Sequence, residues 1–65
     1  MTLLFHDPVT SRYISHTRAT AIAYEAADWQ AVDPAEMRAI FSRLATDEEA
    51  RETFEDITGL EVINR

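Results

Sequence analysis

The chain has 65 residues, a formal net charge of −6 and no cysteine, so disulfides and thiolate metal sites are excluded as sources of stability. A chain of this length forms one domain, residues 1–65, with a barely sufficient core, because it buries only about 60% of its unfolded surface. Hydrophobic residues make up 46% of the sequence and glycine occurs once, which argues against a disordered chain.

The N-terminal segments 2–6 and 12–17 are short and rich in β-branched and aromatic residues, and "DPVTS" separates them. Pro8 presets a turn there, and the Asp7 side chain can bond the turn backbone. This pattern predicts a β-hairpin. In the alternative, Asp7 and Pro8 begin one long helix that reaches residue 32, which would give an all-α bundle. The serines and threonines of residues 11–20 weigh against that helix.

A helix is predicted over about residues 20–32, because "TRATAIAYEAADWQAV" holds six alanines and neither glycine nor proline. Ile22, Ala26 and Trp29 recur at helical spacing and indicate its apolar stripe. Tyr24 and Trp29 are five positions apart and point about 140° away from each other, so one stripe cannot bury both. We expect one of these two aromatic residues to face a partner or a second copy of the chain.

The next helix is predicted over residues 34–45. Asp33 is a good N-cap, Pro34 suits the first helical position, and Glu36 completes a capping box. The apolar residues at helical spacing form one stripe, which must be buried against the rest of the domain. They are Met37, Ile40, Phe41 and Leu44.

A third helix is predicted over residues 47–58, with Thr46 as its N-cap and Glu49 closing a second capping box. Gly59 suits the left-handed position that ends a helix. Its apolar stripe is narrow and comprises Ala50, Phe54 and Ile57, with Leu60 folding back over it. The tail "LEVIN" is compatible with a further short strand beside the hairpin. The predicted fold is therefore α+β, an N-terminal β-hairpin followed by three short helices.

Acidic residues gather near the C-terminus, where residues 47–61 carry seven acids and one arginine while the other fifty residues balance to zero. Acids in the first turn of a helix complement its dipole, but later acids do not. Like charges four residues apart also cost about 0.2–0.5 kcal/mol per pair. A solvated helix face is one interpretation, and a contact face for a basic partner is the other. The residues of this predicted contact face are Glu48, Glu52, Glu55 and Asp56.

The helices predicted at 34–45 and 47–58 have the outline of a helix-turn-helix motif, in which the second helix enters the major groove of DNA. That helix carries five acids between Glu48 and Asp56. Phosphate contact requires lysine and arginine, and carboxylates would repel the backbone. The sequence therefore predicts no direct binding to nucleic acid.

Catalytic and metal-binding motifs are scarce. His6, Asp7 and His16 are the only group resembling metal ligands, and their spacing matches no zinc pattern. There is no cysteine nucleophile and no glycine-rich phosphate loop. We expect no enzyme activity, no metal and no cofactor. The sequence has neither an apolar run of membrane-spanning length nor a signal-peptide pattern, so the expected location is the cytoplasm.

Small size, concentrated negative charge and the lack of catalytic motifs together favour a non-enzymatic inhibitor or regulator. It is expected to bind a basic, nucleic-acid-facing surface of a larger protein. The combination fits phage or mobile-element proteins that block host machinery, and the exclusive use of arginine over lysine fits a GC-rich bacterial source or its phage. The alternatives are a DNA mimic and a structural oligomerising module. Because the core is thin, we also expect a homodimer, with Trp29 or Tyr24 in its interface.

Overall fold

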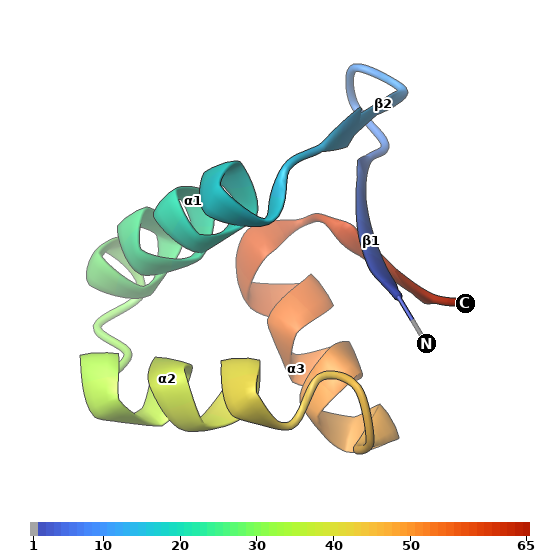
Figure 1. The fold of residues 1–65 in the computed structure, drawn as a ribbon. Helices are drawn as coiled ribbons and strands as arrows, with labels where there is room; N and C mark the ends of the chain where they lie inside the picture. The colour runs from blue at the N-terminus through green and yellow to red at the C-terminus, as the bar shows by residue number, and fades with distance from the viewer. Residues whose placement is uncertain (1) are drawn as a thin grey trace.

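The computed structural model describes residues 2–65 and contains three strands and three helices (Figure 1). Helices account for 53% and strands for 19% of it, which confirms the α+β class and the N-terminal hairpin. The C-terminal tail also forms a strand, which pairs with the first strand of the hairpin. In chain order the elements are β1 (Leu3–Asp7), β2 (Arg12–Ile14), α1 (His16–Trp29), α2 (Pro34–Ser42), α3 (Glu48–Thr58) and β3 (Glu61–Asn64).

The sheet has the order β2-β1-β3, and both pairings are antiparallel. Its central residue is Phe5, which lies opposite Ile14 on one side and Val62 on the other. All three side chains belong to the core or pack against it. Because side chains alternate along a strand, the neighbouring residues Leu4 and His6 point to the opposite face of the sheet. The helices gather on one side of the sheet (Figure 1), and Phe5 points toward them, since its ring contacts those of Phe41 in α2 and Phe54 in α3.

Aromatic rings connect the sheet to the helices. The rings of Phe5 and Phe54 have centroids 5.7 Å apart, and those of Phe41 and Phe54 are 5.1 Å apart in a T-shaped contact. Phe5 and Phe54 are 1% and 0% exposed, while Phe41 is partly buried. The apolar stripes predicted for α2 and α3 are confirmed, since Phe41 and Ile57 pack against the core and the other members are buried. These buried members are Met37, Ile40, Leu44, Ala50, Phe54 and Leu60.

Helix α1 differs from its predicted bounds at both ends. It begins at His16, because the Ser15 hydroxyl accepts a hydrogen bond of 3.1 Å from the Arg18 N–H and so acts as the N-cap. It ends at Trp29, because Ala31 takes a left-handed conformation with φ of 56° and the Val32 N–H donates to the Ala27 carbonyl at 2.8 Å. This is a Schellman-type ending with alanine where glycine is usual.

The buried line of α1 also differs from the expected stripe. Ile22 and Ala26 are only partly buried, and Trp29 is exposed. The fully buried residues of α1 are the alanines Ala19, Ala23 and Ala27. Alanine permits the closest approach between a helix and its neighbours, so α1 lies against the aromatic core through its smallest side chains.

The predicted start of α2 is confirmed, since the Asp33 carboxylate accepts a hydrogen bond of 2.9 Å from the Ala35 N–H and Pro34 is the first helical residue. The helix ends at Ser42, earlier than expected. Turns over residues 43–46 follow, and they move the N-cap of α3 to Asp47, whose carboxylate accepts from the Glu49 and Ala50 N–H groups. The prediction of Thr46 as cap is wrong by one residue.

The capping boxes predicted for α2 and α3 do not form, whereas the predicted end of α3 is confirmed. Within residues 2–65, neither the Glu36 nor the Glu49 side chain closes the box expected of it. Gly59 does end α3, with φ of 74° and its N–H donating to the Glu55 carbonyl at 2.8 Å.

The left-handed conformations of Ala31 and Gly59 predict opposite effects of exchanging alanine and glycine at these two positions. Ala31→Gly should raise the free energy of unfolding by about 1 kcal/mol, since a left-handed alanine costs about that much. Gly59→Ala should lower it by a similar amount, because a Cβ there meets nothing within 4 Å and only the backbone cost remains. Urea titration measures both, and a destabilised Ala31→Gly variant would contradict the assigned helix end.

Candidate functional site

The outward surface of α3 carries a row of three acids, Glu48, Glu52 and Asp56, which we call the acidic row. All three are exposed, and they lie on the side of the helix opposite to Phe54. Successive members are four residues and therefore about 6 Å apart along the helix. Among residues 2–65 the only salt bridge joins His6 to Glu61, so no described cation neutralises the acidic row.

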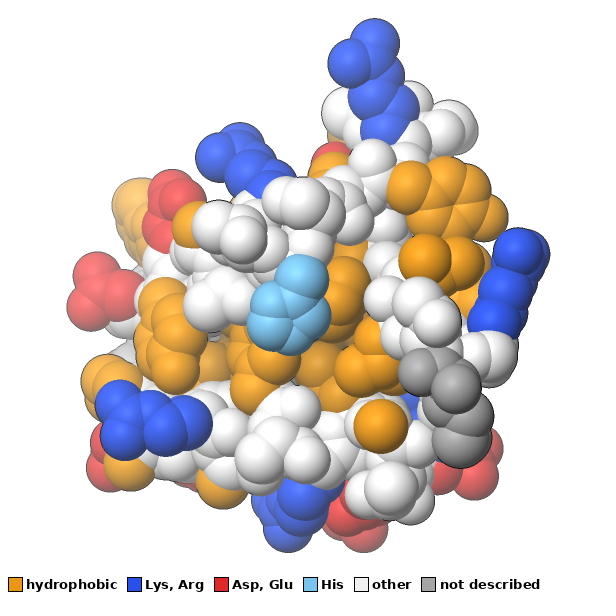
Figure 2. All heavy atoms as spheres, in the orientation of Figure 1, with side chains coloured by type: hydrophobic (Ala, Val, Ile, Leu, Met, Phe, Trp, Pro, Cys, Tyr) orange, Lys and Arg blue, Asp and Glu red, His pale blue; other side chains and the backbone are white. Residues whose placement is uncertain are grey.

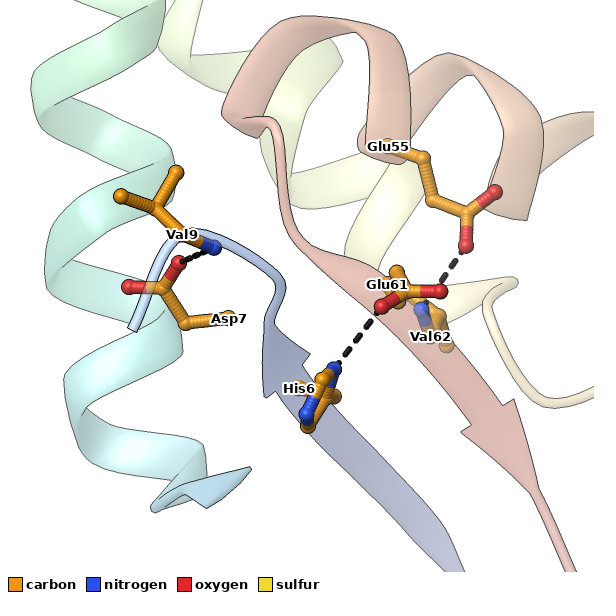
Figure 3. A network of polar contacts seen from close by, with 6 residues as sticks. All are labelled: His6, Asp7, Val9, Glu55, Glu61 and Val62. Atoms are coloured by element: carbon orange, nitrogen blue, oxygen red, sulfur yellow. Dashed lines mark hydrogen bonds and ion pairs between the residues drawn. The ribbon is translucent and has the colours of Figure 1, made fainter. Parts of the chain in front are cut away.

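Glu55 is not part of this free surface, although it was predicted to be. Its side chain is partly buried, and its Oε2 accepts a hydrogen bond of 2.8 Å from the Val62 N–H on β3 (Figure 3). The carboxylate thereby satisfies a backbone group of the strand that follows the helix. The interpretation of Glu55 as an acid without a structural role is wrong.

Arg51 is the one base in the acidic segment, and it serves the turn before α3. Its Nη1 donates a hydrogen bond of 3.0 Å to the Leu44 carbonyl, and the side chain is partly buried. The guanidinium thus links α3 to the turns that follow α2, and it forms no ion pair with a described carboxylate. The negative charge of α3 is left largely uncompensated.

A groove of about 250 Å³ runs between α2 and α3. Its lining includes three acids and one arginine, but the acids have local duties: Asp47 caps α3, while Glu36 and Glu49 lie in the first turns of their helices. The groove therefore needs no ligand to explain its residues. It is lined by Glu36, Ile40, Arg43, Asp47, Glu49, Ala50 and Thr53.

Of the two aromatic residues of α1, Trp29 is the one that faces away from the core. Its side chain is 84% exposed, whereas Tyr24 is partly buried and packs against the core. This confirms that one stripe of α1 does not bury both aromatic residues. That Trp29 faces a partner or a second copy of the chain stays a prediction.

The two histidines lie on different faces of the sheet. His6 is on the outer face, where its Nδ1 is 2.8 Å from Oε1 of Glu61 (Figure 3) and its ring is 4.9 Å from that of Tyr13. His16 begins α1 and packs edge-on against Phe5 at 5.8 Å, on the inner side. Asp7 bonds the Val9 N–H of its own turn. In the described part of the chain, no three such side chains are grouped as metal ligands.

Apolar side chains reach the surface in the middle of the view in Figure 2, between the helices and the sheet, and acidic side chains lie mainly around the margin. The described apolar surface and the acidic surface are thus largely separate on this face.

Comparisons with known proteins do not place the chain in a family. It matches no protein-family model, and no curated protein or solved structure is significantly similar to it. None of the helices within residues 2–65 combines the length and apolar character needed to cross a membrane.

The hydrogen bond between Glu55 and β3 predicts that two neighbouring acids differ in their contribution to stability. Glu55→Ala should lower the free energy of unfolding by about 1–2 kcal/mol, because a partly buried N–H loses a charged acceptor. Glu52→Ala should instead raise it by about 0.4–1 kcal/mol, since it removes two like-charge pairs, with Glu48 and with Asp56. Equal effects in urea titrations would show that Glu55 does not hold the strand.

Proposed function

We propose that this chain is a non-enzymatic inhibitor or regulator that acts in the cytoplasm by binding a basic, nucleic-acid-facing surface of a larger protein. The observation that carries the proposal is the acidic row of Glu48, Glu52 and Asp56, exposed along one side of α3 and without an ion-pair partner in residues 2–65. A phage or mobile-element protein that blocks a host protein is the class it fits.

The acids in the second half of α3 do not stabilise their own helix, which supports a role in binding a partner. Its first-turn acids are explained by the helix dipole, but Glu52 and Asp56 lie beyond that turn and each repels the acid four residues before it. The last turn of α3 contains no basic residue that would offset them. A basic partner supplies the missing cations, and the field of a charge row also speeds the encounter.

A strict DNA mimic is the second candidate, and the distribution of charge favours it less. A mimic of a duplex needs acids spread over much of the surface, whereas outside residues 47–61 the acids and arginines are equal in number. The acidic row lies on one side of one helix. This placement fits a local contact better than a copy of two phosphate backbones.

The test is affinity capture from a lysate of the source cells, followed by elution with duplex DNA at constant ionic strength. We expect the wild-type chain to retain a basic protein that the DNA releases, because both compete for one surface. Glu48→Lys combined with Glu52→Lys should abolish this retention, while circular dichroism stays unchanged. Retention should also weaken steeply as salt is raised, since the charges are exposed.

Glu36→Lys combined with Glu61→Lys is the matched control. It changes the net charge equally and also reverses one first-turn acid, but it leaves the acidic row intact. This control should retain the partner as the wild type does. Equal loss in both variants, or a retained protein that DNA does not release, would contradict the proposed function.

A further inference from the structure

Trp29 is the sole tryptophan of the chain and the last residue of α1, and its side chain is 84% exposed. The buried line of the helix runs through Ala19, Ala23 and Ala27. Trp29 comes two positions after Ala27 and so points about 200° around the helix from that residue, away from the core. Packing within the domain does not account for this large apolar side chain.

The backbone beneath Trp29 is held in place. The Val32 N–H donates to the Ala27 carbonyl at 2.8 Å, and Val32 packs against the core. The Gln30 side chain reaches α3, where its Nε2 donates to the Ile57 carbonyl at 2.8 Å. A partner that contacts Trp29 therefore meets an ordered helix end, so little backbone conformational entropy is lost when it binds.

The same hydrogen bond from Gln30 brings the C-terminal ends of two helices together, and both are electrically negative. A helix C-terminus carries partial negative charge, and neither α1 nor α3 has a basic residue in its last turn to offset it. Glu25 and Asp28 on α1 and Asp56 on α3 add exposed carboxylates near these ends. None of the three has an ion-pair partner among the described residues.

We infer that Glu25, Asp28 and Trp29, here called the Trp29 surface, bind a cationic side chain of the partner, with arginine preferred over lysine. The inference rests on the proposed function, because it assumes a basic partner and names the contact. A guanidinium plane stacks on an indole face while its N–H groups reach neighbouring carboxylates, and a compact ammonium does this less well. The homodimer predicted from the sequence is the competing occupant of this surface, and in it the acids of the two copies would oppose each other.

The test uses the full chain and two peptide probes, hexa-arginine and hexa-lysine, at low salt. Since Trp29 is the only tryptophan, its fluorescence reports on this surface alone, while calorimetry reports binding anywhere on the chain. Hexa-arginine should change the emission of Trp29 saturably and more than hexa-lysine does. Trp29→Leu should weaken hexa-arginine binding roughly two- to fivefold, the range for an exposed cation–aromatic contact.

Two single neutralisations with equal charge change serve as a matched pair. Asp28→Asn, beside Trp29, should reduce the fluorescence response, whereas Glu48→Gln, about 13 Å along α3 from the Ile57 carbonyl that Gln30 contacts, should leave it unchanged. If hexa-arginine binds by calorimetry without changing Trp29 emission, the inference is overturned while the acidic row keeps its proposed role.

Light scattering tests whether a second copy of the chain, and not a cationic partner, covers the Trp29 surface. A dimer of the wild-type chain that Trp29→Leu converts to monomer would assign the surface to a second copy and overturn the inference. A chain that stays monomeric at the concentrations of the fluorescence titration supports it. Failure of the lysate capture with an intact hexa-arginine response would instead reject the proposed partner and keep the cation-binding surface.

Discussion

The contact between Phe5 and Phe54 is the interaction on which the rest of the domain depends. Phe5 belongs to the central strand and Phe54 to the middle of α3, and their ring centroids are 5.7 Å apart with both side chains almost fully buried. Phe41 joins them from α2. In a chain that can bury so little surface, these rings supply much of the apolar area available to the core. They also fix α3 in an orientation that turns its acids toward solvent.

Periodicity and turn chemistry predicted the parts of the fold that depend on neighbouring residues alone. Asp33 with Pro34 marks the start of α2, Gly59 marks the end of α3, and the spacing of Ala50 and Phe54 gives the buried side of that helix. The outward position of the acidic row follows from the same spacing. These features are set within a few turns of one helix, so the sequence contains the information directly.

Contacts between distant segments account for what could not be predicted. Glu55 acquires its role from the Val62 N–H, which becomes a neighbour only after β3 returns to the sheet. The choice between Tyr24 and Trp29 depends on which line of α1 is buried, and close packing selects the alanine line. Ala31 adopts a left-handed conformation because Val32 must reach the core, although alanine itself does not favour that conformation.

The hydrogen bond from the Val62 N–H to Glu55 affects how readily copies of the chain aggregate through the edge of the sheet. An open strand edge is a template on which other chains add strands and form fibrils. At the β3 edge a carboxylate occupies the Val62 N–H and brings negative charge, and at the other edge β2 has only three residues. Both edges of the sheet are therefore poor templates for strand addition. The acidic helix α3 thus protects a marginally stable chain against aggregation.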